Sequence, residues 1–170
     1  MPERRYTSSL ITQLLPNQVF VFGSNRDGFH GAGAAGLACR GIATNDWRQD
    51  KWFLQALEAP IDSRDRVGFW AILGVGVGYQ QGILGASYAI VTVSRPGARR
   101  SIPLCDILLQ LKNLGIFARQ HPELEFLSVV QGGGYNGYTQ DEFRDLYQQW
   151  VREDEPPHNI LFPEAMRLVI

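Results

Sequence analysis

The chain has 170 residues, of which 45% are apolar, and this size and composition suit one compact domain. Its formal net charge is −1 and its pI is near 6.3, so it carries no electrostatic footprint for duplex nucleic acid. No apolar run is long enough to span a bilayer, and the N-terminus lacks the apolar core of a signal peptide, so we expect a cytoplasmic protein with no membrane partner.

The first part of the chain predicts one strand and one helix separated by a polar loop. Residues 1–17 show no strong pattern and are expected to form an N-terminal lead-in to a single ligand-binding domain over residues 18–170. QVFVF, residues 18–22, is β-branched and aromatic, which predicts a buried strand. GAGAAGLACR follows a polar loop, and its alanines and leucine favour a helix beginning near Ala32. A short helix is expected around residues 52–57.

The middle of the chain is apolar and then basic. Residues 69–85 are rich in glycine and predict strand material around an irregular loop, and SYAIVTV, residues 87–93, predicts a strand. The following turn, SRPGARR, holds three arginines that could attract a phosphate or belong to a solvated loop: Arg95, Arg99 and Arg100. Cys39 and Cys105 lie far apart in apolar surroundings, and we expect buried thiols in a reducing compartment.

The last third predicts two helices and two strands. After Pro103, apolar residues recur at i, i+3, i+4 and i+7, which is typical of a helix packed against a sheet. EFLSVV, residues 125–130, predicts a strand. Thr139 and Glu142 form a capping box for a helix that runs to about residue 152, and NILFP, residues 159–163, predicts a last strand. Alternating strands and helices indicate an α/β sheet.

Two junctions share the order strand, glycine-rich loop, helix. The first is VFVF–GSNRDGFHGAG–AAGLA and the second is FLSVV–QGGGYNGY–TQDEF. Glycine allows a backbone to approach a ligand closely, and the free N–H groups and dipole of a following helix favour an anion. If the two strands are parallel, both loops open at the same sheet edge, which suits a diphosphate. The alternative is that each loop is only a tight turn.

Other motifs with a known chemistry are unsupported. GAGAAG matches G-x-G-x-x-G, but eight residues, 23–30, separate it from the preceding strand, so a nicotinamide-dependent oxidoreductase is not indicated. No phosphate-binding G-x-x-x-x-G-K-[ST] or hydrolase G-x-S-x-G occurs. The three histidines and two cysteines are too scattered for a metal site, and no metal or cofactor is expected.

FGSNRDGFHGAGAAGLA, residues 22–38, resembles the asparagine-then-glycine loop of macro domains. The chain is more closely similar to a set of uncharacterised phage and bacterial macro-like proteins, through residues 22–25, 30–35, 85–90 and 132–138. The resemblance implies a single-domain, three-layer macro-like α/β fold with a mixed central sheet and helices on both faces. It also implies binding of a small-molecule ligand, ADP-ribose or a related nucleotide diphosphate, and leaves open whether an ADP-ribosyl derivative is hydrolysed.

The resemblance also implies roles for individual residues. Asn25 would lie near the distal ribose and is, with His30, the catalytic candidate; His30 could equally hold the loop through a backbone carbonyl. LLPNQ, before Val19, offers no acid for an adenine amino group, so the base is left undetermined. Phe162 is the aromatic candidate to flank a base. The remaining candidate ligand-binding residues are the two loops: Gly23, Ser24, Gly31, Ala32, Gly33 and Ala34, and then Gly132, Gly133, Gly134, Tyr135 and Asn136.

A second hypothesis stays open beside ligand binding. The chain would then be a non-enzymatic interaction protein related to phage or mobile elements, with exposed aromatic anchors at Phe29, Tyr79 and Tyr135. The oligomeric state is not predicted by either hypothesis.

Overall fold

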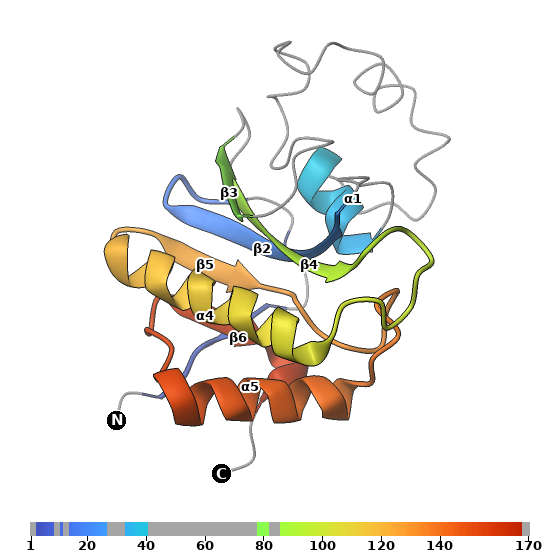
Figure 1. Ribbon diagram of the computed structural model, residues 1–170. Coiled ribbons are helices and arrows are strands. Elements are labelled where there is room, and N and C mark those ends of the chain that lie inside the picture. Colours follow the sequence, from blue (N-terminus) through green and yellow to red (C-terminus); the bar gives the residue numbers. More distant parts are fainter. Residues whose placement is uncertain are drawn as a thin grey trace.

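The centre of the computed structural model is a six-stranded sheet (Figure 1). The structure describes residues 3–8, 11, 14–26, 33–40, 78–81 and 86–167. The helix expected around residues 52–57 and most of the strand material expected in residues 69–85 lie outside the described residues. The strands are β1 (Tyr6–Thr7), β2 (Gln18–Asn25), β3 (Gly78–Gln81), β4 (Ala86–Val93), β5 (Glu125–Ser128) and β6 (Ile160–Pro163).

The strand order is β1-β6-β5-β2-β4-β3. Four pairs of neighbouring strands are parallel: β1–β6, β6–β5, β5–β2 and β2–β4. The remaining pair, β4–β3, is antiparallel, so the described sheet is mixed. The α/β class and the mixed sheet expected from the sequence are therefore confirmed. The expected lead-in contributes to the sheet, because Tyr6 and Thr7 add an edge strand alongside Phe162 and Pro163.

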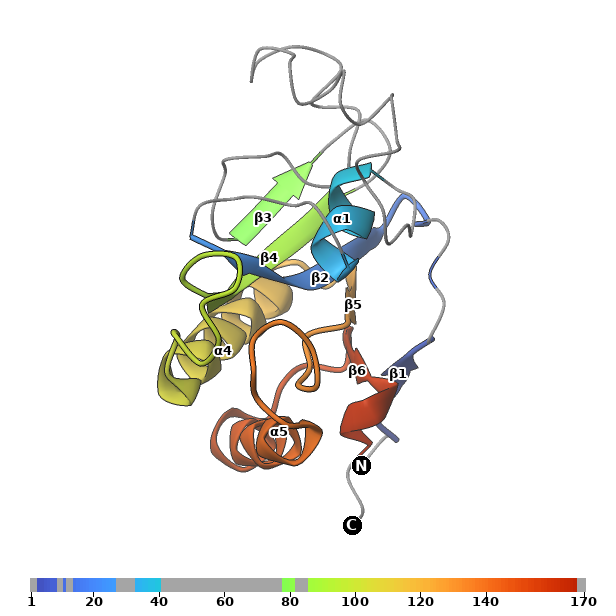
Figure 2. The ribbon, with the colours of Figure 1, turned by 90° about the vertical axis from the view of Figure 1, so that its right-hand side faces the viewer.

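Helices pack against both faces of the sheet (Figures 1 and 2). Side chains of a strand alternate between its two faces, and β2 shows this clearly. Val19 and Val21 pack with α4 (Leu104–Gln120) and α5 (Gln140–Asp154), whereas Phe20 and Phe22 pack with Ala38 of α1 (Gly33–Arg40). A 3-10 turn, η2 (Glu164–Met166), follows β6.

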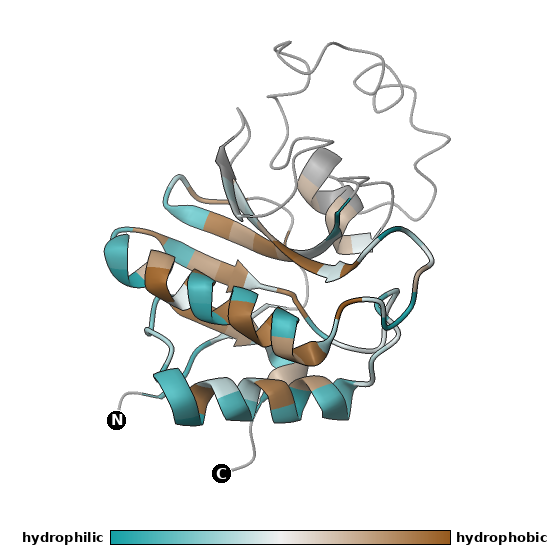
Figure 3. Ribbon diagram, in the orientation of Figure 1, coloured by the Kyte–Doolittle hydropathy of each residue, from teal (hydrophilic) through white to brown (hydrophobic). Residues whose placement is uncertain are grey.

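The two long helices are amphipathic, as the sequence predicts, and hydrophobic and hydrophilic residues alternate along their ribbons (Figure 3). Most of their apolar side chains are buried, although Leu109 and Ile116 of α4 are exposed. Trp150 of α5 is buried and stacks on Phe162. The expectation of buried thiols is wrong for Cys105, which is exposed in the first turn of α4, on the helix face turned away from the sheet. No described helix is long and apolar enough to cross a membrane.

The chain leaves the adjacent strands β2 and β5 toward opposite faces of the sheet. From β2 it continues to α1 on one face, and from β5 it continues to α5 on the other. Because β2 and β5 are parallel neighbours, this divergence opens a crevice at their carboxyl ends. In open α/β sheets, such a crevice is where ligands usually bind.

Candidate functional site

A cavity of about 590 Å³ occupies this crevice, at the carboxyl ends of β2, β4 and β5. Both glycine-rich junctions predicted from the sequence contribute to it. The described residues that line the cavity are either apolar or polar, and none of them carries a charge. They are Gly23, Ser24, Asn25, Gly33, Ala34, Ala35, Thr92, Val93, Pro96, Gly97, Val129, Val130, Gln131, Gly132, Gly133, Gly134, Tyr135, Asn136 and Gln140.

The first junction supplies the end of β2 and the start of α1. Ser24 and Asn25 are buried beneath the cavity, with Asn25 only 6% exposed, so the Asn25 amide lies where solvent scarcely reaches. Gly33 begins α1 with a positive φ of 59°, which favours glycine there. No acidic residue occupies the first turn of α1, so the partial positive charge of its N–H groups is not offset within that turn.

A β-bulge at the end of β4 brings Thr92 to the cavity. Ser24 pairs with Val91 and Asn25 with Val93, so Thr92 is the additional residue on β4. Bulges re-aim side chains and are frequent beside active sites. Thr92 lies so close to Gly23 that a Cβ at position 23 would be 3.1 Å from its Oγ1.

Gln110 of α4 supports the bulge through hydrogen bonds to the backbone of Val91. Within the described residues, the pairing of β3 with β4 ends at Ala89, and Val91 has no described strand partner on that side. The Val91 N–H donates to Gln110 Oε1 at 2.7 Å, and Gln110 Nε2 donates to the Val91 carbonyl at 2.8 Å. The carboxamide thus satisfies both backbone groups of Val91, as a strand partner would.

The second junction is a loop that its own polar groups hold rigid. Asn136 Nδ2 donates to the Gln131 carbonyl at 2.8 Å, and the Tyr138 N–H donates to Asn136 Oδ1 at 3.0 Å. The Gly133 N–H donates to the Tyr138 carbonyl at 2.7 Å. The Asn136 side chain therefore shapes the loop through both ends of its amide. Gly132 packs directly on the backbone of Thr139, whose oxygen would lie 2.0 Å from a Cβ at position 132.

A buried network fixes the point where this loop leaves the sheet. Tyr147 Oη donates to the Val130 carbonyl at 2.9 Å and lies 3.2 Å from Ser128 Oγ. The Val130 N–H donates to Ser128 Oγ at 3.3 Å. Complete burial raises the pKa of Tyr147 above its ordinary value, so the hydroxyl stays neutral and keeps its proton for Val130.

The N-terminus of α5 is capped by its own side chains. The Glu142 N–H donates to Thr139 Oγ1 at 3.1 Å, and the Thr139 N–H donates to Glu142 Oε2 at 2.7 Å, which is the predicted capping box. Asp141 and Glu142 place two carboxylates in the first turn. These charges oppose a second anion, so the helix dipole argument favours α1 over α5 as the phosphate-facing helix.

Tyr135 lies across the mouth of the cavity and links the two junctions. Its side chain is 74% exposed, yet its Cε2 would be 3.6 Å from a Cβ on Gly33 at the start of α1. An aromatic ring in this position can cover or stack on a ligand that enters from solvent. Tyr138, by contrast, is buried and donates its hydroxyl to the Ile102 carbonyl at 2.8 Å.

Most of the residues predicted from the sequence meet in this one place. The structure does not bring Phe162 there: its ring is fully buried between Tyr147, Trp150 and Arg4, on the face covered by α5. His30, Gly31, Ala32 and Phe29 lie outside the described residues. The predicted residues that line the cavity are Gly23, Ser24, Asn25, Gly33, Ala34, Gly132, Gly133, Gly134, Tyr135 and Asn136.

The sequence reasoning missed three polar residues of the lining. Thr92 depends on a bulge that only strand pairing reveals. Gln131 directly precedes the glycine run and Gln140 opens α5, so both were within the motif but were not singled out. Gln140 Oε1 is buried and has no hydrogen-bond partner within the described part of the chain, while its Nε2 would be 3.3 Å from a Cβ on Gly133.

The chemistry available in the described lining is neutral. It contains no carboxylate, imidazole, thiol or cationic side chain, and no described cluster of His, Cys, Asp or Glu could hold a metal ion. Hydroxyls, carboxamides and backbone N–H groups remain, and these bind ligands by hydrogen bonds. Comparisons with protein-family models, with curated proteins and with solved structures found no match.

Proposed function

We propose that the chain binds ADP-ribose or a related nucleotide diphosphate in this cavity, on a macro-like scaffold with helices on both faces of the sheet. The observation that carries the proposal is the meeting of both glycine-rich junctions at the crevice between β2 and β5. The volume of about 590 Å³ lies within the range of small-molecule sites, which is roughly 300–1,000 Å³. The resemblance to macro domains supports the choice of ligand.

Each part of the lining suits one part of such a ligand. The start of α1, whose first turn holds no acidic residue, offers N–H groups and a positive dipole end to a diphosphate. The buried Asn25 amide and the Thr92 hydroxyl suit the hydroxyls of a ribose. Val93, Val129 and Val130 supply apolar surface for a sugar or base. Backbone dipoles can hold an anion without a cationic side chain in the cavity.

Hydrolysis of an ADP-ribosyl derivative places a further requirement on the site. Asn25 can orient a water molecule, but a carboxamide has no basic group that takes its proton near neutral pH. None of the other described lining residues has a carboxylate or imidazole for this step. In this proposal Asn25 is a binding and positioning residue, and catalysis depends on His30.

Calorimetry with ADP-ribose, ADP and AMP tests the binding proposal. We expect ADP-ribose and ADP to release or absorb heat and AMP to bind more weakly, because AMP lacks the second phosphate. Asn25→Asp places a negative charge in the cavity and should weaken ADP-ribose binding. Asn113→Asp, on the exposed side of α4, makes the same charge change away from the site. Absence of heat and of any thermal shift at millimolar ADP-ribose would refute the proposal.

His30→Ala separates an enzyme from a binding protein. In an enzyme, this variant should lose single-turnover release of ADP-ribose from an ADP-ribosylated substrate while retaining ADP-ribose binding. Full activity in both His30→Ala and Asn25→Ala would show that the catalytic assignment is wrong. If the protein binds none of the nucleotides and instead recovers one stoichiometric protein partner, the interaction-protein alternative takes its place.

A further inference from the structure

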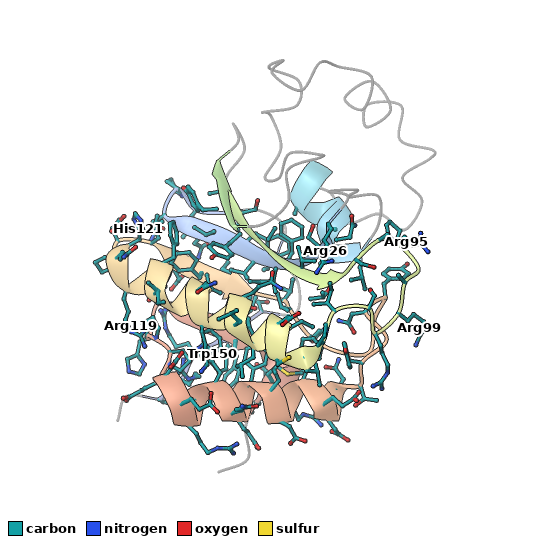
Figure 4. All side chains as sticks on the ribbon, in the orientation of Figure 1. Arg26, Arg95, Arg99, Arg119, His121 and Trp150 are labelled. Carbon is teal, nitrogen blue, oxygen red and sulfur yellow. The ribbon has the colours of Figure 1, made fainter. Side chains whose placement is uncertain are left out.

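Three arginines lie within two positions of cavity-lining residues in the sequence and are here called the mouth arginines: Arg26 follows Asn25, Arg95 precedes Pro96, and Arg99 lies two residues after Gly97. The Arg26 N–H donates to the Ser94 carbonyl at 3.3 Å, which places the end of β2 beside the turn that carries Arg95. Pro96 and Gly97 of that turn line the cavity. All three arginines are exposed and lie at the end of the molecule opposite Arg119 and His121 (Figure 4).

The mouth arginines have no ion-pair partner within the described part of the chain. Two of the described carboxylates near this end, at the start of α5, are already paired, whereas Asp106 in the first turn of α4 is exposed and makes no ion pair within the described residues. Arg144 Nη1 lies 2.6 Å from Asp141, and Arg100 holds Glu142 with both terminal nitrogens. Among the described residues at this end, three arginines but only one carboxylate, Asp106, therefore lack an ion pair, although the whole chain has a net charge of −1. Asp27, next to Arg26, lies outside the described residues.

Tyr135 adds an aromatic surface to this positive region. Its ring is 74% exposed beside Gly33, and its hydroxyl makes no hydrogen bond within the described part of the chain. Tyr135 lines the same cavity as Pro96 and Gly97 of the turn that carries Arg95 and Arg99. An exposed aromatic ring together with arginines is a combination that binds single-stranded nucleic acid: the cations follow the phosphates and the ring stacks on a base. Arginine also suits phosphate better than lysine, because its donors form a fork.

We propose that the mouth arginines and Tyr135 bind single-stranded nucleic acid, so that the group held in the cavity is a strand end or is attached to a strand. This inference rests on the proposed function for the identity of that group. An acidic peptide would also meet the arginines, but it would leave the exposed ring without a stacking partner. A duplex is disfavoured because its bases are already stacked and the charge excess is small.

Fluorescence anisotropy with a labelled oligothymidylate of about eight nucleotides tests the proposal, since this length falls within the usual site size. Replacing all three mouth arginines by glutamine should weaken binding by about tenfold or more and lower the salt slope by roughly 2, since each phosphate contact contributes about 0.7. Tyr135→Ala should weaken binding and leave the salt slope unchanged. Arg152→Gln, in the last turn of α5 at the opposite end, is the control and should bind as wild type does.

The outcomes separate this inference from the proposed function. Binding of ADP-ribose by calorimetry without binding of the oligothymidylate would overturn the inference and leave the proposed function intact. Oligothymidylate binding that depends on the mouth arginines, without ADP-ribose binding, would support the surface and refute the proposed ligand. Equal binding of poly-glutamate and oligothymidylate, or an affinity that Tyr135→Ala does not change, would overturn the choice of nucleic acid.

Discussion

The guanidinium of Arg100 holds the carboxylate of Glu142 at both oxygens, with Nη1 2.8 Å from Oε1 and Nη2 2.9 Å from Oε2. Arg100 adopts a left-handed φ of 53°, and its Nε donates to the Gly137 carbonyl at 3.1 Å. One residue of the basic turn therefore holds the end of the second glycine-rich loop and the start of α5 together. The turn that carries Arg95 and Arg99 is thus fixed relative to the cavity.

Acidification should release this contact. The backbone N–H of Thr139 and the Arg100 guanidinium lower the pKa of Glu142 below its ordinary value of 4.5. A carboxyl with a lowered folded-state pKa stabilises the fold above that ordinary value and loses this effect as the pH falls through the folded pKa. We expect wild type to melt above Glu142→Gln at neutral pH and the two melting temperatures to converge as the pH falls through the lowered pKa of Glu142.

Asp145→Asn is the charge-matched control for this experiment, because Asp145 is exposed on the same helix and makes no ion pair within the described residues. An equal difference in melting temperature between wild type and Glu142→Gln at neutral and acid pH would contradict the role given to Glu142.

Removing the cap hydroxyl of α5 should cost a modest amount of stability. Thr139→Ala leaves the Glu142 N–H without its acceptor, and loss of such a cap costs about 1 kcal/mol. For a domain of this size, that lowers the melting temperature by roughly 2–4 °C. Thr139→Ser keeps the hydroxyl and should melt close to wild type; an equal loss in both variants would mean that the methyl group, not the cap, stabilises this position.

The Gln110 carboxamide should affect both stability and the site. Gln110→Ala removes two hydrogen bonds to Val91, worth about 1 kcal/mol each, and frees the bulge that presents Thr92. We expect a loss of about 2 kcal/mol in urea unfolding and weaker ADP-ribose binding. Gln120→Ala, exposed at the end of the same helix, is the control. Unchanged affinity in a destabilised Gln110→Ala protein would show that the bulge does not position Thr92 for the ligand.

The buried Tyr147 hydroxyl should stabilise the fold through Val130 and Ser128. Tyr147→Phe leaves the Val130 carbonyl without this donor in a dry environment, which costs about 1–3 kcal/mol. A double-mutant cycle with Ser128→Ala measures the coupling, which we expect to be at least 0.5 kcal/mol because the two hydroxyls lie 3.2 Å apart. Simple additivity of the two substitutions would contradict a shared network.

Elements with strong local signals were predictable from the sequence. The apolar periodicity of α4, the capping box of α5 and the β-branched runs of β2 and β4 each specify their element locally. β1 was not predicted, because two residues carry no period and become a strand only by pairing with β6. The bulge at Thr92 likewise arises from the register between β2 and β4, which no local pattern encodes.

The residues of the site were predictable where they belong to one sequence motif. They were not predictable where side-chain packing determines their position. Glycine runs after β2 and β5 indicated both loops, since parallel strands end at the same edge. Phe162 was expected beside a base, but the sequence of β6 does not reveal which face of the sheet a side chain lies on. In the structure the Phe162 ring stacks on Trp150 in the core. Asn136 lines the cavity, yet its amide is used within the loop.

The glycines of the second loop are required for different reasons, and this affects how related sequences should be interpreted. Gly132 has no room for a Cβ against Thr139, whereas Gly134 faces open space and has no positive φ. Any homologue that keeps this turn would retain glycine at position 132 even after losing its ligand. A glycine conserved at position 134 would instead indicate selection for ligand binding. Position 134 therefore distinguishes homologues that bind the ligand from homologues that have kept only the fold.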